Sequence, residues 1–247
     1  MNYILDVCKR MGSTPDIEID HYLGIAGADY FNYQSRFGAL LGSFIANKFA
    51  SLVTKSDVVL DFGCGGGFVL KALECRARLG VDINPVARLT AADNGVTCFE
   101  RLAEVNDGTV DVAIAHHSLE HVASPLLVLR ELRLKLKPNG RLLIVVPIDD
   151  WRTQRDYHAG DVNHHLYTWT PLLLGHLLKE AGFDLDTFSS RLGVNGWFRA
   201  FPYCYGKLPT SLLSLALRIW CALKKTREIQ ATVRNYSGMS TARDVNL

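Results

Sequence analysis

The sequence predicts an α/β protein built on one doubly wound, seven-stranded mixed sheet. Between residues 57 and 190, short apolar segments alternate with amphipathic segments that carry helix start and stop residues. This alternation is typical of parallel strands joined by helices that cover both faces of a sheet. Residues 141–147 form a continuous apolar run, as expected for a strand buried on both faces. A helical cap before the first strand and an insertion between strands six and seven complete the predicted architecture.

Seven segments are expected to be strands, because they are short, mostly apolar and bounded by turn residues. The seventh is expected to pair antiparallel beside the sixth. In chain order the predicted strands are residues 58–60, 78–82, 96–101, 110–115, 141–147, 183–189 and 226–233.

Helices are expected before and between these strands. In chain order they begin at Tyr30, Phe68, Pro85, Pro125 and Pro171, and the first runs towards Phe49. The helix over residues 125–137 should end at Pro138-Asn139-Gly140, whose residue types favour a helix stop. Thr170 can cap the last helix, with Pro171 at its first position.

A glycine-rich turn follows the first predicted strand and its acidic residue, Asp61. Glycines occupy positions 63, 65, 66 and 67. Glycine adopts positive φ and leaves no side chain between backbone and ligand, so this turn would present bare amides at a helix start to a nucleoside-type cofactor. An ordinary tight strand–helix turn is the alternative for this segment taken alone.

The spacing of the glycines separates the cofactor classes that use such a turn. A dinucleotide fingerprint requires glycine at position 68, where this chain has Phe68. The phosphate loop of nucleotide triphosphate enzymes is excluded, because no Gly-Lys-Ser/Thr follows the turn. Asp82 ends the second predicted strand, 15 residues after Gly67, and its carboxylate could accept hydrogen bonds from both hydroxyls of a ribose.

Four segments together resemble the motifs of a known enzyme family. Asp-x-Gly-x-Gly-x-Gly at 61–67 and the strings at 80–85, 119–122 and 136–142 are similar to class I S-adenosylmethionine-dependent methyltransferases, in particular their type 11 and type 23 subgroups. The resemblance covers roughly residues 55–190. It implies a Rossmann-like fold, S-adenosyl-L-methionine as the cofactor and a methyl-transfer reaction.

The same resemblance implies which residues hold the cofactor. Asp82 would bind the ribose, Glu100 and Arg101 would lie against the adenine, and Tyr33 or Arg36 would reach the methionine carboxylate. The alternative for Glu100 and Arg101 is that they form an ion pair on the surface. The alternative for the N-terminal helix is that it only packs on the core. The full predicted set is Asp61, Gly63, Cys64, Gly65, Gly67, Asp82, Ile83, Glu100, Arg101 and His116, with Tyr33 and Arg36 from the N-terminal helix.

Histidines concentrate where an acceptor would bind. Seven of the eight lie at or after position 116, and two groups follow the fourth and fifth predicted strands, whose carboxyl ends are where open α/β sheets bind ligands. An alcohol or phenol acceptor benefits from a general base, most often histidine. His117 and His165 are therefore the predicted catalytic bases, whereas His121 is expected to be structural. His117 and His121 would share a face if a helix began that early.

No resident metal is predicted. Asp149, Asp150, Asp161 and the histidines are residue types that bind divalent cations. Their spacing does not require a metal, so this remains an alternative.

One absent motif narrows the acceptor. The segment after the fourth predicted strand is not Asp/Asn-Pro-Pro-Tyr/Phe. In the family that the chain resembles, the amino methyltransferases use that motif to hold a planar amine. The leading prediction is O-methylation of a small molecule or of a glycan, which could be linked to a lipid. C-methylation of a quinone-like ring is the alternative within the family. A nicotinamide oxidoreductase and a non-catalytic binding module are the alternatives from other classes.

The C-terminal part of the chain is basic. Residues 191–247 carry 9 Lys/Arg against 2 Asp/Glu, whereas residues 1–190 carry 18 against 23. A basic region of this kind suits an anionic partner or is simply a solvated surface. Residues 193–225 form the predicted insertion, and 208–225 have the pattern of a helix with a wide apolar face. This helix would pack on the core or on a second subunit, or would act as a lid or a membrane-surface helix.

Composition indicates a cytoplasmic enzyme without a metal or disulfide framework. The six cysteines form no Cys-x-x-Cys pair, no signal peptide is evident, and nucleic-acid binding modules are not recognised. The inner membrane surface is a second possible location. We expect a single domain with a cap at 1–50, a core at 51–190, an insertion at 191–225 and a last strand and tail at 226–247.

Overall fold

The computed structural model describes residues 20–149, 155–157, 159, 161, 163–194 and 227–235, together with seven positions between 209 and 223. Seven strands form one mixed sheet in the order β3-β2-β1-β4-β5-β7-β6. All neighbouring strands are parallel except β7, which runs antiparallel to both β5 and β6. The strands are β1 (Val58–Phe62), β2 (Ala77–Val81), β3 (Thr97–Phe99), β4 (Val110–His116), β5 (Leu136–Ile148), β6 (Asp184–Val194) and β7 (Arg227–Arg234). The predicted seven-stranded, doubly wound architecture is confirmed.

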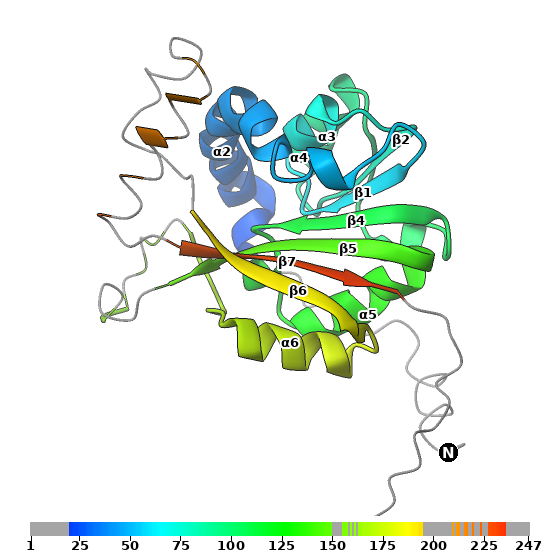
Figure 1. The fold of residues 1–247 in the computed structure, drawn as a ribbon. Coiled ribbons are helices and arrows are strands. Elements are labelled where there is room, and N and C mark those ends of the chain that lie inside the picture. The colour runs from blue at the N-terminus through cyan, green and yellow to red at the C-terminus, as the bar shows by residue number, and fades with distance from the viewer. Residues whose placement is uncertain are drawn as a thin grey trace, which may run out of the picture.

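Helices cover both faces of this sheet (Figure 1). Those of the first half of the chain, α2 to α4, lie on one face, and α5 and α6 lie on the other. The helices are α2 (Gly24–Ala46), α3 (Phe68–Ala72), α4 (Pro85–Asp93), α5 (Pro125–Lys135) and α6 (Pro171–Glu180). Short 3-10 turns occur at η1 (Asp20–Tyr22), η2 (Ala50–Leu52), η3 (Leu102–Glu104) and η4 (Leu119–His121).

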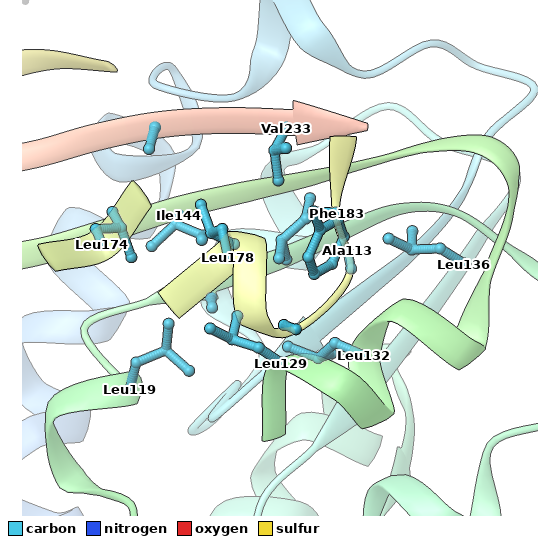
Figure 2. Packing of buried hydrophobic residues seen from close by; sticks show 14 of the residues in the cluster. Ala113, Leu119, Leu129, Leu132, Leu136, Ile144, Leu174, Leu178, Phe183 and Val233 are labelled. Carbon is cyan, nitrogen blue, oxygen red and sulfur yellow. The ribbon is translucent and has the colours of Figure 1, made fainter. Parts of the chain in front are cut away.

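The two faces of the central strands supply two separate hydrophobic cores. On β4, Ala113 and Ala115 pack in one core, whereas Val112 and Ile114 pack in the other. This alternation follows from the two-residue period of a strand. Figure 2 shows the larger core, where leucines of α5 and α6 pack beneath β5 and β7.

Several predicted boundaries are wrong. The N-terminal helix begins at Gly24 rather than Tyr30, and β6 continues to Val194, past its predicted end at residue 189. Helix α5 ends at Lys135, and the stop residues 138–140 lie within β5.

A side chain from the end of β7 explains the early stop of α5. The Asn235 amide donates to the carbonyl oxygens of Arg133, Leu136 and Lys137 at 3.1–3.3 Å. It therefore satisfies carbonyl groups that the end of the helix leaves without partners. The chain then enters β5, where the positive φ of Asn139, 62°, accommodates the irregular turn.

The predicted helix at 208–225 lies largely outside the described residues. Within it, Leu212, Leu215, Ile219 and Leu223 are helical and 54–75% exposed. Among the described helices, none combines the length and apolarity needed to span a bilayer.

The packing of α5 gives a test of the fold. Leu129 is fully buried and Leu134 is 55% exposed on the same helix. We expect Leu129→Ala to lower the free energy of unfolding by about 2–5 kcal/mol, because it leaves a cavity. Leu134→Ala should change it by no more than about 0.5 kcal/mol. Urea-induced unfolding followed by circular dichroism measures both, and equal losses would contradict this assignment of the core.

Candidate active site

The glycine turn after β1 is shaped by three residues with positive φ. Gly63, Gly65 and Gly67 have φ values of 74°, 51° and 71°. A Cβ atom at Gly65 would meet nothing within 4 Å, so the backbone is open there, whereas a Cβ at Gly67 would lie 2.8 Å from Val96. Gly65 therefore offers a bare backbone to a ligand, and Gly67 is required for the packing of the turn.

Asp82, directly after β2, is bound to this turn. Its Oδ2 accepts a hydrogen bond from the Gly65 N–H at 2.8 Å, and its Oδ1 accepts one from the Asn84 N–H at 2.9 Å. Burial raises the pKa of Asp82, although these two amides and Arg88 oppose the shift. Each carboxylate oxygen retains acceptor capacity, so the predicted contact with a ribose is compatible with the geometry.

Asn84 connects the cofactor side of the sheet to the helix that covers it. Its buried side chain accepts hydrogen bonds from Val86 N–H and Ala87 N–H and so caps α4. Its amide nitrogen donates to the Gly27 carbonyl of α2 at 2.7 Å. The predicted site residues did not include Asn84, although an Asn followed by Pro at a helix start is a recognisable cap.

Asp61 is a buried acid beside the turn. It is 3% exposed, and its Oδ1 has no hydrogen-bond partner among the described residues. Burial, with a smaller contribution from the charge of Asp82, raises the pKa of Asp61 to about 8. A buried carboxyl group with an unused oxygen favours a ligand that brings donors or positive charge. The ammonium and sulfonium groups of S-adenosyl-L-methionine have this character, so the residues present fit that cofactor.

One cavity of about 980 Å³ joins the glycine turn to the histidines. This volume is at the upper end of the range for small-molecule sites. Of the predicted cofactor residues, those that line it are Asp61, Gly63, Cys64, Gly65, Asp82, Ile83, Glu100, Arg101 and His116. Both predicted bases, His117 and His165, also line it.

Tyr33 and Arg36 do not line this cavity. Helix α2 turns about 100° per residue, so one stripe of side chains faces the site. That stripe includes Tyr30, Phe31 and Gln34, which leaves positions 33 and 36 on other faces. The prediction that an N-terminal helix covers the site agrees with this arrangement, but Tyr33 and Arg36 are not among the residues of the helix that line the cavity.

Glu100 and Arg101 occupy the rim of the cavity. The Glu100 carboxylate accepts a hydrogen bond from Arg88 at 2.9 Å and lies 3.5 Å from Arg101 Nε. The two residues line the cavity, and Glu100 also forms ion pairs with Arg88 and Arg101. The contact with adenine stays a prediction.

His116 lies at the end of β4, beside a buried ion pair. Its Nε2 is 3.4 Å from Lys48 Nζ, which is in turn 2.8 Å from a Glu228 oxygen. Burial and the Lys48 charge lower the pKa of His116 well below its ordinary value. His116 is therefore neutral at physiological pH and is unsuited to provide positive charge.

His117 follows in a strained backbone conformation, with a φ of 51°. Its Nε2 is 3.4 Å from Glu228, and its Nδ1 is 3.5 Å from Glu120. Burial acts to raise the pKa of Glu228, but His117 and Lys48 hold it below the ordinary value. Glu228 was missed from the sequence. It is one of two acids in the basic C-terminal part of the chain, and this contrast was the available indication.

His165 is oriented by Asp149. The two side chains are joined by a hydrogen bond of 2.8 Å through His165 Nδ1. Although burial lowers the pKa of His165, the hydrogen bond and charge of Asp149 raise it above the ordinary value. Among the acids considered as metal ligands, Asp149 thus contacts a histidine, Asp161 is exposed, and Asp150 lies outside the described residues.

His121 does not share a helical face with His117. The 3-10 turn η4 contains only Leu119–His121, and His117 precedes it. His121 Nδ1 lies 2.6 Å from the hydroxyl oxygen of Tyr22, and burial lowers the pKa of His121 to about 3. His121 also lines the cavity.

Comparison with known sequences identifies a domain of matching extent. The family described as "Methyltransferase domain" matches residues 33–187, which is more than half of the chain. A 101-residue segment is 36% identical to a ubiquinone biosynthesis O-methyltransferase of Xanthomonas euvesicatoria pv. vesicatoria, and it covers 35% of this chain and 41% of that protein. An enzyme of the same name from Pseudomonas aeruginosa is 35% identical over 98 residues, or 42% of its length. The chain thus matches less than half the length of these relatives.

Solved structures show the same fold at low sequence identity. A SAM-dependent methyltransferase of Thermotoga maritima superposes with a TM-score of 0.58 at 15% identity, over 83% of this chain and 94% of that chain. Phosphoethanolamine N-methyltransferase 2 of Haemonchus contortus, solved with S-adenosyl-L-methionine, gives a TM-score of 0.51 at 12% identity, over 78% and 51% of the two chains. Together with the glycine turn and the position of Asp82, these matches show that the chain belongs to the class I S-adenosylmethionine-dependent methyltransferases.

Proposed function

We propose that this methyltransferase transfers the methyl group to a hydroxyl oxygen of a small molecule or of a glycan. Such a glycan can be linked to a lipid. The observation that carries the proposal is that His117 and His165 line the same cavity as the glycine turn. A hydroxyl acceptor must lose its proton as its oxygen reacts, and a nearby imidazole can receive it. The name of the sequence relatives, O-methyltransferase, favours this reaction over the C-methylation of a quinone-like ring.

The cofactor end of the cavity is assigned to S-adenosyl-L-methionine. Asp82 and the open backbone at Gly65 would hold its nucleoside, and the unused oxygen of Asp61 would face its positively charged part. When bound, the cofactor supplies a methyl group that is already activated as a sulfonium. The protein's contribution is then to position the acceptor and to accept its proton.

His117 is the better placed of the two proposed bases. The residue that follows it, Ser118, packs directly against the glycine turn, since a Cβ at Gly63 would lie 2.6 Å from the Ser118 Cβ. His117 would thus lie close to a methyl donor bound at this turn. Glu228 holds one of its nitrogens, which fixes the orientation of the ring. His165, held by Asp149, is the second candidate.

The cofactor assignment is tested by substituting Asp82. In Asp82→Asn the new NH₂ group would face the N–H of Gly65 or of Asn84, so one of these two hydrogen bonds is lost. The variant also lacks the carboxylate charge that would accept the hydrogen bonds of the ribose hydroxyls. We expect the affinity for S-adenosyl-L-methionine to fall about 10- to 100-fold, as measured by calorimetry. Asp93→Asn, on the exposed end of α4, is the matched control and should bind normally. Normal binding by Asp82→Asn would refute the assignment.

Asp61 should make the stability of the ligand-free protein depend on pH. Its folded-state pKa of about 8 exceeds the ordinary aspartate value of 3.8, so between these two pH values the folded protein holds a proton that the unfolded chain releases. The free energy of unfolding should therefore fall as the pH rises through this window, by up to about 1.4 kcal/mol per pH unit for one group. Asp61→Asn removes this component. Urea titrations at pH 5 and pH 8 give the free energy of unfolding of both proteins. If this free energy changes equally with pH in the native protein and in Asp61→Asn, the inference is contradicted.

Each proposed base is tested singly. We expect His117→Gln to lower kcat by roughly 10²- to 10⁴-fold while cofactor affinity is unchanged, because only the proton acceptor is removed. Release of S-adenosylhomocysteine is measured with a panel of phenols, catechols and sugars. His165→Gln is assayed in parallel, and His176→Gln, on the exposed side of α6, serves as the control. If both cavity variants turn over at the normal rate, neither histidine is the base.

A further inference from the structure

Three histidines surround one buried acid at the acceptor end of the cavity. We call Glu120 and its neighbours His117, His121 and His165 the Glu120 cluster. Glu120 is fully buried, and neither of its carboxylate oxygens has a hydrogen-bond partner among the described residues. Burial also raises its pKa. A buried carboxyl group in this state is costly unless a ligand or a positive charge completes its environment.

The ligand atoms of the cluster lie close enough to converge on one metal ion. Glu120, His121 and His165 each offer one ligand atom, and these atoms all lie within 4.8 Å of one another. Ligands bound at about 2.0–2.2 Å in a tetrahedral zinc site are about 3.3–3.6 Å apart, so the three side chains would draw together by up to about 1.5 Å when the ion binds. His117 Nδ1, 3.5 Å from a Glu120 oxygen, lies just outside this group of three.

Each ligand histidine is held through its other nitrogen. Tyr22 Oη lies 2.6 Å from His121 Nδ1, and Asp149 Oδ2 lies 2.8 Å from His165 Nδ1. Both contacts leave Nε2 to face the cluster. Histidines that bind metals almost always give the second ring nitrogen to a carboxylate or another oxygen, which orients the ring. The outer partners therefore support a metal site more specifically than the three ligands do alone.

We propose that Glu120, His121 and His165 bind a divalent transition-metal ion, with Zn²⁺ preferred. Two imidazoles and one carboxylate suit zinc, and three protein ligands leave a fourth position for another molecule. Mg²⁺ prefers oxygen ligands and an octahedral shell, so it fits this set poorly. The sequence alone predicted no metal, because the spacing of the acids and histidines did not require one, and Glu120 was not among the acids considered.

The metal would act on the acceptor. His121 and His165 line the cavity, so a ligand in the cavity can reach an ion that they hold. A hydroxyl bound to Zn²⁺ loses its proton more readily, and His117 would receive that proton. This division of roles rests on the proposed O-methylation, whereas metal binding itself does not.

Metal binding is measured on the full chain after treatment with EDTA and without S-adenosyl-L-methionine. Calorimetry with ZnCl₂ should give one equivalent of binding, and MgCl₂ should give none at the same concentration. We expect Glu120→Gln and His165→Asn to weaken Zn²⁺ binding by more than about 100-fold, and Asp149→Asn to weaken it about 10- to 100-fold. Co²⁺ provides a second readout, since its visible absorption band should appear in the native protein and be lost in His165→Asn.

Controls distinguish a specific loss of metal binding from a loss of folding, and they test the metal site independently of the proposed function. His176→Gln should bind Zn²⁺ normally, and Glu120→Gln should keep its affinity for S-adenosyl-L-methionine. Absence of Zn²⁺ binding, or equal binding by native protein and Glu120→Gln, would overturn the metal site. If Zn²⁺ binds as expected but no hydroxyl acceptor is methylated, the metal site stands and the O-methylation proposal fails. Full activity in the presence of EDTA would refute the role of the metal in acceptor activation.

Discussion

The carboxylate of Asp82 holds the cofactor end of this enzyme together. One oxygen accepts the Gly65 N–H of the turn after β1, and the other accepts the Asn84 N–H at the start of α4. Asn84 then caps α4 and reaches the Gly27 carbonyl of α2. A buried carboxylate is tolerated only where such donors surround it. The shape of the turn, the start of α4 and the position of the covering helix are consequently set together.

The acceptor end is organised by charges that come from distant parts of the chain. Lys48 follows α2, Glu228 lies on β7, and His117 follows β4, yet Glu228 contacts both of the other side chains. Buried ion pairs add little net stability, but removal of one partner leaves a costly isolated charge. The two contacts made by Glu228 thus serve mainly to define one arrangement of the cavity wall.

The sequence predicts the features that depend on near neighbours and fails where distant residues meet. The glycine turn, Asp82 and the strand–helix alternation follow from local spacing, and the structure has them where expected. The end of α5 was misplaced because Asn235, a hundred residues away, satisfies its carbonyl groups. The histidines of the cavity were recognised from their positions at strand ends. Their carboxylate partners were not, because no local pattern connects Glu228 to His117.

The place of β7 in the sheet has a consequence for how the enzyme is made. This last strand lies between β5 and β6, so β6 has no partner until residues near the end of the chain arrive. During synthesis the cofactor half, β1 to β4 with their helices, can assemble while the edge of β5 is still bare. Glu228 arrives with β7, so His117 acquires its carboxylate only in this final step. A nascent chain would therefore be able to recognise the methyl donor before it possesses a finished acceptor pocket.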